Sequence, residues 1–332
     1  MLGYEYVIAK IHGIHSKSIV GDNYKRLRKI DTIDKLAKEL LGDDIDSNLT
    51  TKKMFTYIES KLKRKIYNQI NDIVKYFDYK NELLNALILK YEIENVKIII
   101  NCHYSKEKNV KDLFEVKLKN SINYKLVYSM DLSDFKNITS IFVNTIFSFV
   151  LPLIESKKSR IYVENELDKF YYINLLNSLK GFTKEQKEKI KKVLIEEMNW
   201  HNILWALRTR FYYNKVFDDV KETFIKMNGL ISLDLIKNIF SMEFVPNEVD
   251  KIFEKYPKSI KLLIKETTDE NGEVNIPLLE EKVEERIANL YIGYFYIEFN
   301  ILSIIAYVYI KMKEYNNIVK LVESLRYNLN LD

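Results

Sequence analysis

The stretch LLNALILKYEIENVKIII, residues 83–100, decides the fold, because it joins two apolar runs through a short polar segment around Asn95. Leu, Ile, Lys and Glu are abundant throughout the 332 residues, whereas there are only 8 glycines and 4 prolines. Many helix formers and few turn formers favour long helices joined by short connections. With 47% hydrophobic residues the chain can bury one large core or two to three small ones. We therefore predict an all-α fold.

The pattern around Asn95 occurs three times, as Glu94-Asn95-Val96, His201-Asn202-Ile203 and Asn316-Asn317-Ile318. Each asparagine follows an apolar helical stretch and precedes an amphipathic one. An asparagine side chain can bond its neighbouring backbone, and the residue tolerates a left-handed conformation. We therefore predict a corner between two helices at each of the three positions.

A second marker recurs where helices should begin: a hydroxyl residue followed by an aspartate. A hydroxyl at the N-cap accepts a bond from a free backbone N–H, and a carboxylate complements the helix dipole. The three instances are Thr32 with Asp34, Ser133 with Asp134, and Ser232 with Asp234.

The two markers keep the same order along the chain, which predicts three similar helical repeats at residues 1–110, 111–220 and 221–332. Such repeats would pack around a shared pseudo-threefold axis or stack as a short solenoid. Either arrangement gives a rigid frame with a concave surface.

Charge and composition indicate a cytoplasmic protein. The formal net charge of +5 is small and both signs are mixed along the chain, so nothing demands nucleic acid as a partner. Cys102 is the one cysteine, which excludes an internal disulfide and suits a reducing compartment. Residues 1–10 lack the pattern of a secretion signal. Residues 138–154 and 287–310 are apolar, but their length and polar residues favour helices packed inside a protein over membrane spans.

A search for catalytic, cofactor-binding or metal-binding residues selects none. His12 and His15 can share a helix face but have no third ligand nearby, which favours a packing or surface role. Cys102 and His103 are adjacent and point to different faces of a helix or strand, so they do not form a chelate. No glycine-rich phosphate loop or nucleophile elbow occurs in the sequence, so we predict neither nucleotide binding nor catalysis.

Two acidic clusters are the remaining chemical candidates, because all-helical isoprenoid synthases bind magnesium diphosphate through paired aspartates. The spacing of these aspartates does not fit such a motif, and the first cluster is interpreted as a hydrated loop or a helix cap. The residues are Asp43, Asp44 and Asp46, and then Asp218 and Asp219.

The segment from Trp205 to Tyr213 mixes aromatic residues with Arg208 and Arg210. This mixture is used for single-stranded nucleic acid and for protein interfaces. We interpret it first as core with a salt-bridged helix face, and second as a protein interface.

Several segments together resemble the C subunit of bacterial and archaeal V/A-type ATPases, whose counterpart in the eukaryotic vacuolar enzyme is the d subunit. Lys10 stands where family members often have Arg, and residues 102–128 match little. The segments that carry the resemblance are Tyr4–Lys10, Leu89–Lys97, Glu166–Tyr171, Asn202–Arg208 and Tyr309–Ile318.

The resemblance implies a non-catalytic rotor subunit without cofactors. Its funnel would receive the central-stalk shaft, and its other face would rest on the membrane c-ring, so that torque passes through it. The protein would be cytoplasmic and peripheral to the membrane. Whether the complex moves protons or sodium stays open. The alternatives are an unrelated helical-repeat adaptor and, less favoured, an all-α isoprenoid-type enzyme that uses the two acidic clusters.

Overall fold

The chain is helical. The computed structural model describes residues 4–42, 45, 49–77, 81–110, 113, 115–116, 118–241 and 248–327. Within these ranges, the one β feature is an isolated antiparallel bridge between Thr268 and Val274. The predicted all-α class is confirmed. The chain divides into two compact units, which we describe separately.

Unit 1 takes in the described residues of 1–88, 111–114 and 291–332. Helix α16 packs along α4 and also contacts α1 and α3. Every residue from Ile301 to Lys311 is buried, as in a helix surrounded by its core. The helices are α1 (Tyr4–His15), α2 (Gly21–Leu27), α3 (Ile33–Leu41), α4 (Thr51–Tyr76), the start of α5 (Glu82–Tyr104), the end of α15 (Ile276–Ile297) and α16 (Ile301–Tyr327).

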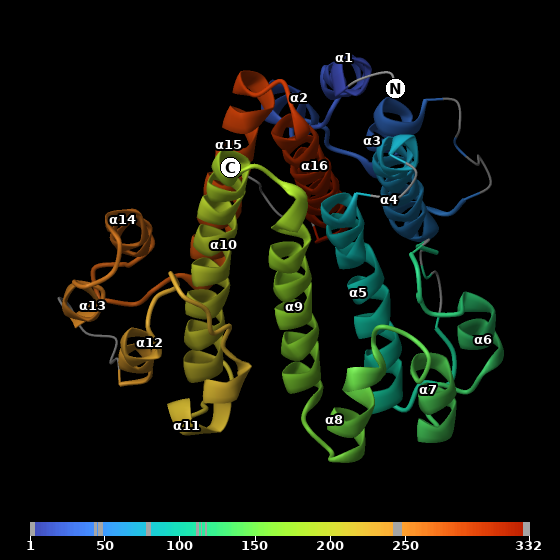
Figure 1. Cartoon of the computed structure of the whole chain (residues 1–332). Coiled ribbons are helices and arrows are strands. Elements are labelled where there is room, and N and C mark those ends of the chain that lie inside the picture. Colours follow the sequence, from blue (N-terminus) through green and yellow to red (C-terminus); the bar gives the residue numbers. More distant parts are fainter. Residues whose placement is uncertain are drawn as a thin grey trace. The chain divides into compact units, whose positions relative to one another are not determined.

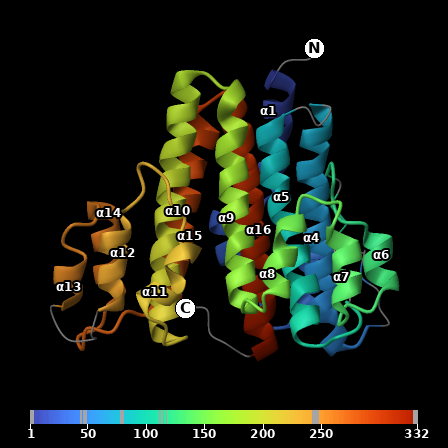
Figure 2. The same cartoon turned by 60° about the horizontal axis from the view of Figure 1, so that its bottom comes forward.

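Unit 2 takes in the described residues of 89–110 and 115–290. Helices α9 and α10 lie side by side, α12 packs against α10, and α13 contacts both α12 and α14 (Figure 1, Figure 2). Besides parts of α5 and α15, the unit contains α6 (Tyr124–Ser129), α7 (Phe135–Phe142), η1 (Ser148–Val150), α8 (Leu151–Glu155), α9 (Arg160–Asn177), η2 (Ser178–Gly181), α10 (Lys184–Phe211), α11 (Phe217–Val220), η3 (Lys221–Thr223), α12 (Leu233–Phe240), α13 (Glu248–Ile252) and α14 (Lys258–Glu266).

Two of the three predicted helix caps are confirmed. The Thr32 hydroxyl accepts from the Lys35 N–H at the start of α3, and the Ser232 hydroxyl accepts from the Leu235 N–H at the start of α12. The third cap is one residue later than predicted. Asp134, rather than Ser133, is the N-cap of α7, and its carboxylate accepts from the Lys136 N–H at 2.9 Å.

The predicted corners at the three asparagines are wrong. Asn95, Asn202 and Asn317 lie inside α5, α10 and α16, and each helix runs through its asparagine without a break. Their side chains are buried. The side-chain amide groups donate hydrogen bonds to distant segments rather than to the adjacent backbone. These side chains therefore do not compete with the hydrogen bonds of the helix.

The two apolar stretches are each divided. Residues 138–154 form the end of α7, a turn, η1 and α8 rather than one helix. In the turn, the Thr145 hydroxyl donates to the Phe142 carbonyl and accepts from the Phe147 N–H. These side-chain hydrogen bonds satisfy backbone groups locally and take the place of helical hydrogen bonds. Residues 287–310 are interrupted between α15 and α16. In the described part of the chain, no helix has the length and apolar character to cross a membrane.

Candidate functional site: buried polar pairs on three long helices

Each of the three buried asparagines has a polar neighbour three residues earlier on the same helix. The pairs are Glu92 with Asn95 on α5, Asn199 with Asn202 on α10, and Glu314 with Asn317 on α16. Residues three apart face the same side of a helix. All six side chains are at most 7% exposed. Because a buried polar group without a partner is costly, the bonds of these pairs determine what packs against each helix.

The pair on α16 holds the segment between α1 and α2. The Ile19 N–H donates to Glu314 Oε1 at 3.0 Å, and Asn317 Nδ2 donates to the Ile19 carbonyl at 2.9 Å. Lys311, one turn earlier, donates to the Ser18 hydroxyl at 2.9 Å and to Glu314 Oε2 at 2.6 Å. Three side chains of α16 therefore fix two consecutive residues that precede α2.

The pair on α10 holds the segment that leads into α12. Asn202 makes two bonds with one residue: its Nδ2 donates to the Ile225 carbonyl at 2.9 Å, and its Oδ1 accepts from the Ile225 N–H at 3.0 Å. Asn199 Oδ1 accepts from the Ile231 N–H at 2.8 Å. The segment is thus fixed at both ends before the cap of α12.

The pair on α5 holds the segment that leads into α6. Glu92 Oε1 accepts from the Ile122 N–H at 2.9 Å and also from the Ser121 hydroxyl. Asn95 Nδ2 donates to the Tyr124 hydroxyl at 2.9 Å, which accepts in turn from the Val116 N–H at 3.1 Å. Here one contact runs through a side chain rather than directly to backbone.

The three pairs do the same physical task. In each, a buried side chain accepts the backbone N–H of an isoleucine, Ile19, Ile122 or Ile225, in a segment before a short helix. Sequence reasoning found the asparagines and missed Glu92, Asn199 and Glu314. The available signal was a polar residue three positions before each asparagine.

Two of these carboxyl groups lie in contrasting electrostatic surroundings. Burial raises the pKa of Glu92, although the bonds from Ser121 and Ile122 oppose the shift. Glu314 instead pairs with Lys311, whose ammonium group is also buried. Burial lowers the pKa of Lys311; Glu314 opposes this shift and the charge of Lys65 adds to it.

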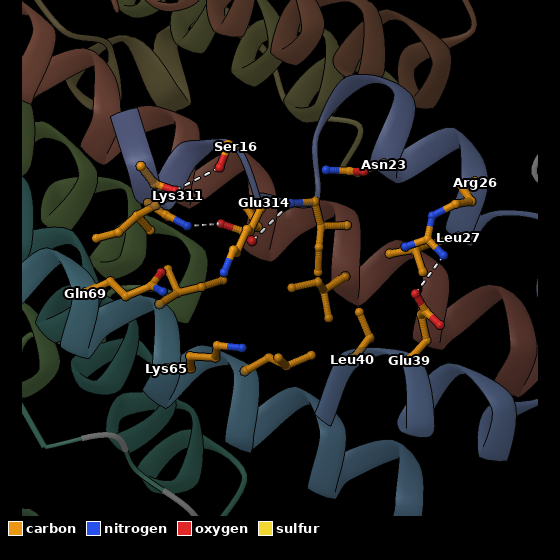
Figure 3. A pocket seen from close by; sticks show the side chains of 17 residues that line it. Ser16, Asn23, Arg26, Leu27, Glu39, Leu40, Lys65, Gln69, Lys311 and Glu314 are labelled. Carbon is orange, nitrogen blue, oxygen red and sulfur yellow. Dashed lines mark hydrogen bonds and ion pairs between the residues drawn. The ribbon is translucent and has the colours of Figure 1, made fainter. Parts of the chain in front are cut away.

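A cavity of about 530 Å³ opens beside the pair on α16, within unit 1 (Figure 3). Its walls come from α1, the following segment with α2, and from α3, α4 and α16. Figure 3 shows the Lys311 ammonium directed at Glu314 on one side and the Arg26–Glu39 ion pair on the other.

The histidines that the sequence singled out pack on aromatic side chains. His12 stacks on Phe295 with ring centroids 4.2 Å apart, and His15 Nε2 lies 3.1 Å from the Tyr296 hydroxyl. Burial lowers the pKa of His15, and the nearby Lys311 charge adds to this effect.

The structure does not bring the Cys102 thiol and the adjacent His103 imidazole onto a common partner. The Cys102 thiol lies 3.9 Å from Glu107 Oε2, and His103 Nδ1 lies 3.1 Å from the Leu132 carbonyl. Across the described ranges, no group of three or more His, Cys, Asp or Glu side chains is placed to hold a metal ion.

The second acidic cluster lies at the start of α11, where Asp218 pairs with Lys221 at 3.2 Å and Asp219 follows it. The first cluster, Asp43, Asp44 and Asp46, lies outside the described residues. The convergence of the two clusters that an isoprenoid-type enzyme would need therefore has no support among the described residues.

The segment 205–213 matches the first interpretation of its sequence. Arg208 forms an ion pair with Glu280, and Arg210 lies over the Phe211 ring, 5.7 Å from its centroid. Trp205 Nε1 donates to the Thr223 hydroxyl at 2.6 Å. These contacts fix the C-terminal part of α10 against its neighbours within unit 2.

Comparison with known proteins identifies the family. No curated protein matches the chain. The family model described as "ATP synthase (C/AC39) subunit" matches residues 7–332, nearly the whole length. The resemblance to the C subunit of V/A-type ATPases is thereby confirmed, and the chain belongs to the ATP synthase (C/AC39) subunit family.

Proposed function

We propose that this chain is a non-catalytic rotor subunit that links the central-stalk shaft to the membrane c-ring and transmits torque between them. The observation that carries the proposal is the family match over residues 7–332. The proposal places the chain in the cytoplasm, peripheral to the membrane, and gives it no nucleotide, nucleic acid or cofactor to bind.

The packing of the long helices supports a mechanical role. A part that carries torque must resist deformation, and close-packed interiors compress little. The buried pairs on α5, α10 and α16 add directional bonds that hold the connecting segments in place. Sliding a connection would break bonds to buried groups, which is costly.

The funnel of three repeats, at residues 1–110, 111–220 and 221–332, belongs to this proposal. Its support is the recurrence of a buried pair that accepts an isoleucine N–H, together with a short helix downstream of each held segment. Three copies of one module could present a concave surface to a shaft.

The decisive experiment removes the chain from its ATPase complex in membrane vesicles. Hydrolysis of ATP should continue while the proton or sodium gradient is lost, and adding the purified chain back should restore the gradient. A pH-sensitive dye and a sodium tracer follow both ions. Gradient formation that persists at full rate without the chain would overturn the proposal.

Binding to the shaft separates the rotor role from a general adaptor. The purified chain and the central-stalk shaft proteins should form a stoichiometric complex that is stable in size-exclusion chromatography. An adaptor unrelated to ATPases would elute apart from the shaft.

A further inference from the structure

The cavity in unit 1 has the size and the mixed lining of a ligand site. Its volume of about 530 Å³ falls in the range of about 300 to 1,000 Å³ that is typical of small-molecule sites. It lies wholly within one compact unit, so its walls are defined by contacts internal to that unit.

Positive charge exceeds negative charge in the described lining. Four cationic and two acidic side chains face the cavity: Lys17, Arg26, Lys65, Lys311, Glu39 and Glu314. Both carboxylates are already neutralised, Glu39 by Arg26 at 2.6 Å and Glu314 by Lys311 at 2.6 Å.

Lys17 and Lys65 are the two cationic residues of the lining that do not pair with Glu39 or Glu314. Within the described ranges neither ammonium group has an ion-pair or hydrogen-bond partner. Figure 3 shows Lys65 reaching from α4 with its nitrogen toward the cavity. Two ammonium groups at the edge of one cavity form an attractive site for an anion.

Most of the remaining lining is apolar, and its uncharged polar residues are Ser16, Asn23 and Gln69. Ile14, Ile19 and Leu40 are half-buried and face the cavity from α1, the segment after it and α3. An inorganic anion would leave this surface in contact with water, whereas a short hydrocarbon chain would cover it at a gain of about 25 cal/mol per Å².

We infer that this cavity binds a small amphiphilic anion, a phosphate or carboxylate head group on a short apolar chain. The head group lies between Lys17 and Lys65, and the chain lies on Ile14 and Leu40. The inference concerns a site separate from the proposed torque transmission, and its test does not need the assembled ATPase.

Isothermal titration calorimetry of the full chain with three probes tests the inference. Octyl phosphate carries both parts, inorganic phosphate only the head and octyl glucoside only the chain, all kept below micelle-forming concentrations. Octyl phosphate should bind at least about tenfold more tightly than either of the others. Equal affinity for octyl phosphate and either partial probe would overturn the inference.

Charge variants locate the head group. Lys65→Gln should raise the Kd of octyl phosphate about five- to tenfold, and adding Lys17→Gln should raise it further. Lys53→Gln removes an exposed charge from the same helix α4, away from the cavity lining, and should leave the Kd unchanged. The inference is wrong if Lys65→Gln and Lys53→Gln have the same effect.

A filling variant tests the cavity independently of charge. Gly13 lines the cavity on α1, and a Cβ placed there would meet no atom within 4 Å. Gly13→Leu should therefore fold, improve the local helix propensity and block the chain of the probe. Unchanged octyl phosphate affinity in a folded Gly13→Leu protein would show that the probe binds elsewhere and would refute the site.

Two sources could supply such an anion, a soluble metabolite or a lipid of a membrane. Co-sedimentation with phosphatidic acid vesicles, reduced by Lys65→Gln, would support the site with a lipid as its source. Binding of octyl phosphate without co-sedimentation would support the same site with a soluble source.

Discussion

Asn202 shows how much structure one buried amide can hold. Its side chain bonds both the N–H and the carbonyl of Ile225, and it is 1% exposed. Asn317 reaches the carbonyl of Ile19 in the same manner, 298 positions away in the sequence. Such side chains act as connectors between distant segments rather than as local structure formers.

Replacing Asn202 by leucine should destabilise unit 2. The leucine fills the space but leaves the Ile225 N–H and carbonyl without their partner, which costs about 2–4 kcal/mol. Urea denaturation followed by circular dichroism would measure the change, and amide hydrogen exchange should be faster at Ile225. Asn238→Ala, an exposed position on α12, is the control and should change stability by less than about 0.5 kcal/mol.

Glu92 should make stability depend on pH. Burial raises its pKa in the folded chain, so the folded state binds more protons than the unfolded state between the ordinary and the raised pKa. Stability from this group is therefore greatest at low pH and falls as the pH rises through that window.

The Glu92→Gln variant should lose this part of the pH dependence, since its side chain does not titrate. Thermal unfolding between pH 4 and pH 8 would measure the slope for the wild type and the variant. Glu188→Gln, at an exposed position of α10, should keep the wild-type slope. Identical profiles for wild type and Glu92→Gln would contradict the assignment.

At the scale of elements, α5, α10 and α16 are continuous helices of 23, 28 and 27 residues. The sequence pattern predicts a corner at the asparagine in each of these helices, and a proline substitution distinguishes a continuous helix from a corner. Proline inside a helix removes a hydrogen bond and clashes with the preceding turn, but at a corner it is readily accommodated.

Ile98→Pro, one turn after Asn95 on α5, should therefore cost about 3 kcal/mol or more. Ile98 is 38% exposed, so Ile98→Ala loses little packing and serves as the matched control. Helical content and urea midpoint of the two variants would be compared. A proline variant as stable as the alanine variant would indicate a helix break at this position.

Local rules explain which elements could be predicted. Thr32 and Ser232 were found because an N-cap depends on residues within one turn. The role of the asparagines was misread because their partners lie from 23 to 298 positions away, beyond any local pattern. Nothing in the sequence indicated that Glu314 and Glu92 are buried, because charged residues on a helix are usually solvated.

At the scale of the whole molecule, the family match extends over nearly all residues although the chain divides into two units. Unit 1 combines the described residues of 1–88 with those of 291–332. Segments from near both ends of the sequence therefore form one core, and the bonds from Lys311 and Glu314 to Ser18 and Ile19 are part of it.

Removing one member of the Lys311–Glu314 pair should loosen this connection. Lys311→Met leaves Glu314 as an unpaired buried charge, at a cost of about 3–5 kcal/mol. Trypsin should then cut faster after Lys17, which is exposed and adjacent to Ser18.

The double variant Lys311→Met with Glu314→Gln should recover most of the stability, because the glutamine is neutral and can still accept from Ile19. Urea midpoints and the rate of cleavage after Lys17 would be measured for both variants. A double variant as unstable as Lys311→Met would show that the unpaired charge is not the cause.

The attachment of Ser18 and Ile19 to α16 also determines when this part of the chain can complete its folding during synthesis. These residues are synthesised 293 to 298 positions before Lys311, Glu314 and Asn317. At about 5–20 residues per second, the ribosome needs about 15 to 60 s to cover that distance. Throughout this interval the amide and carbonyl of Ile19 lack the partners that they have in the folded chain. Ser18 and Ile19 are therefore translated early but are among the last parts of unit 1 to reach their final partners.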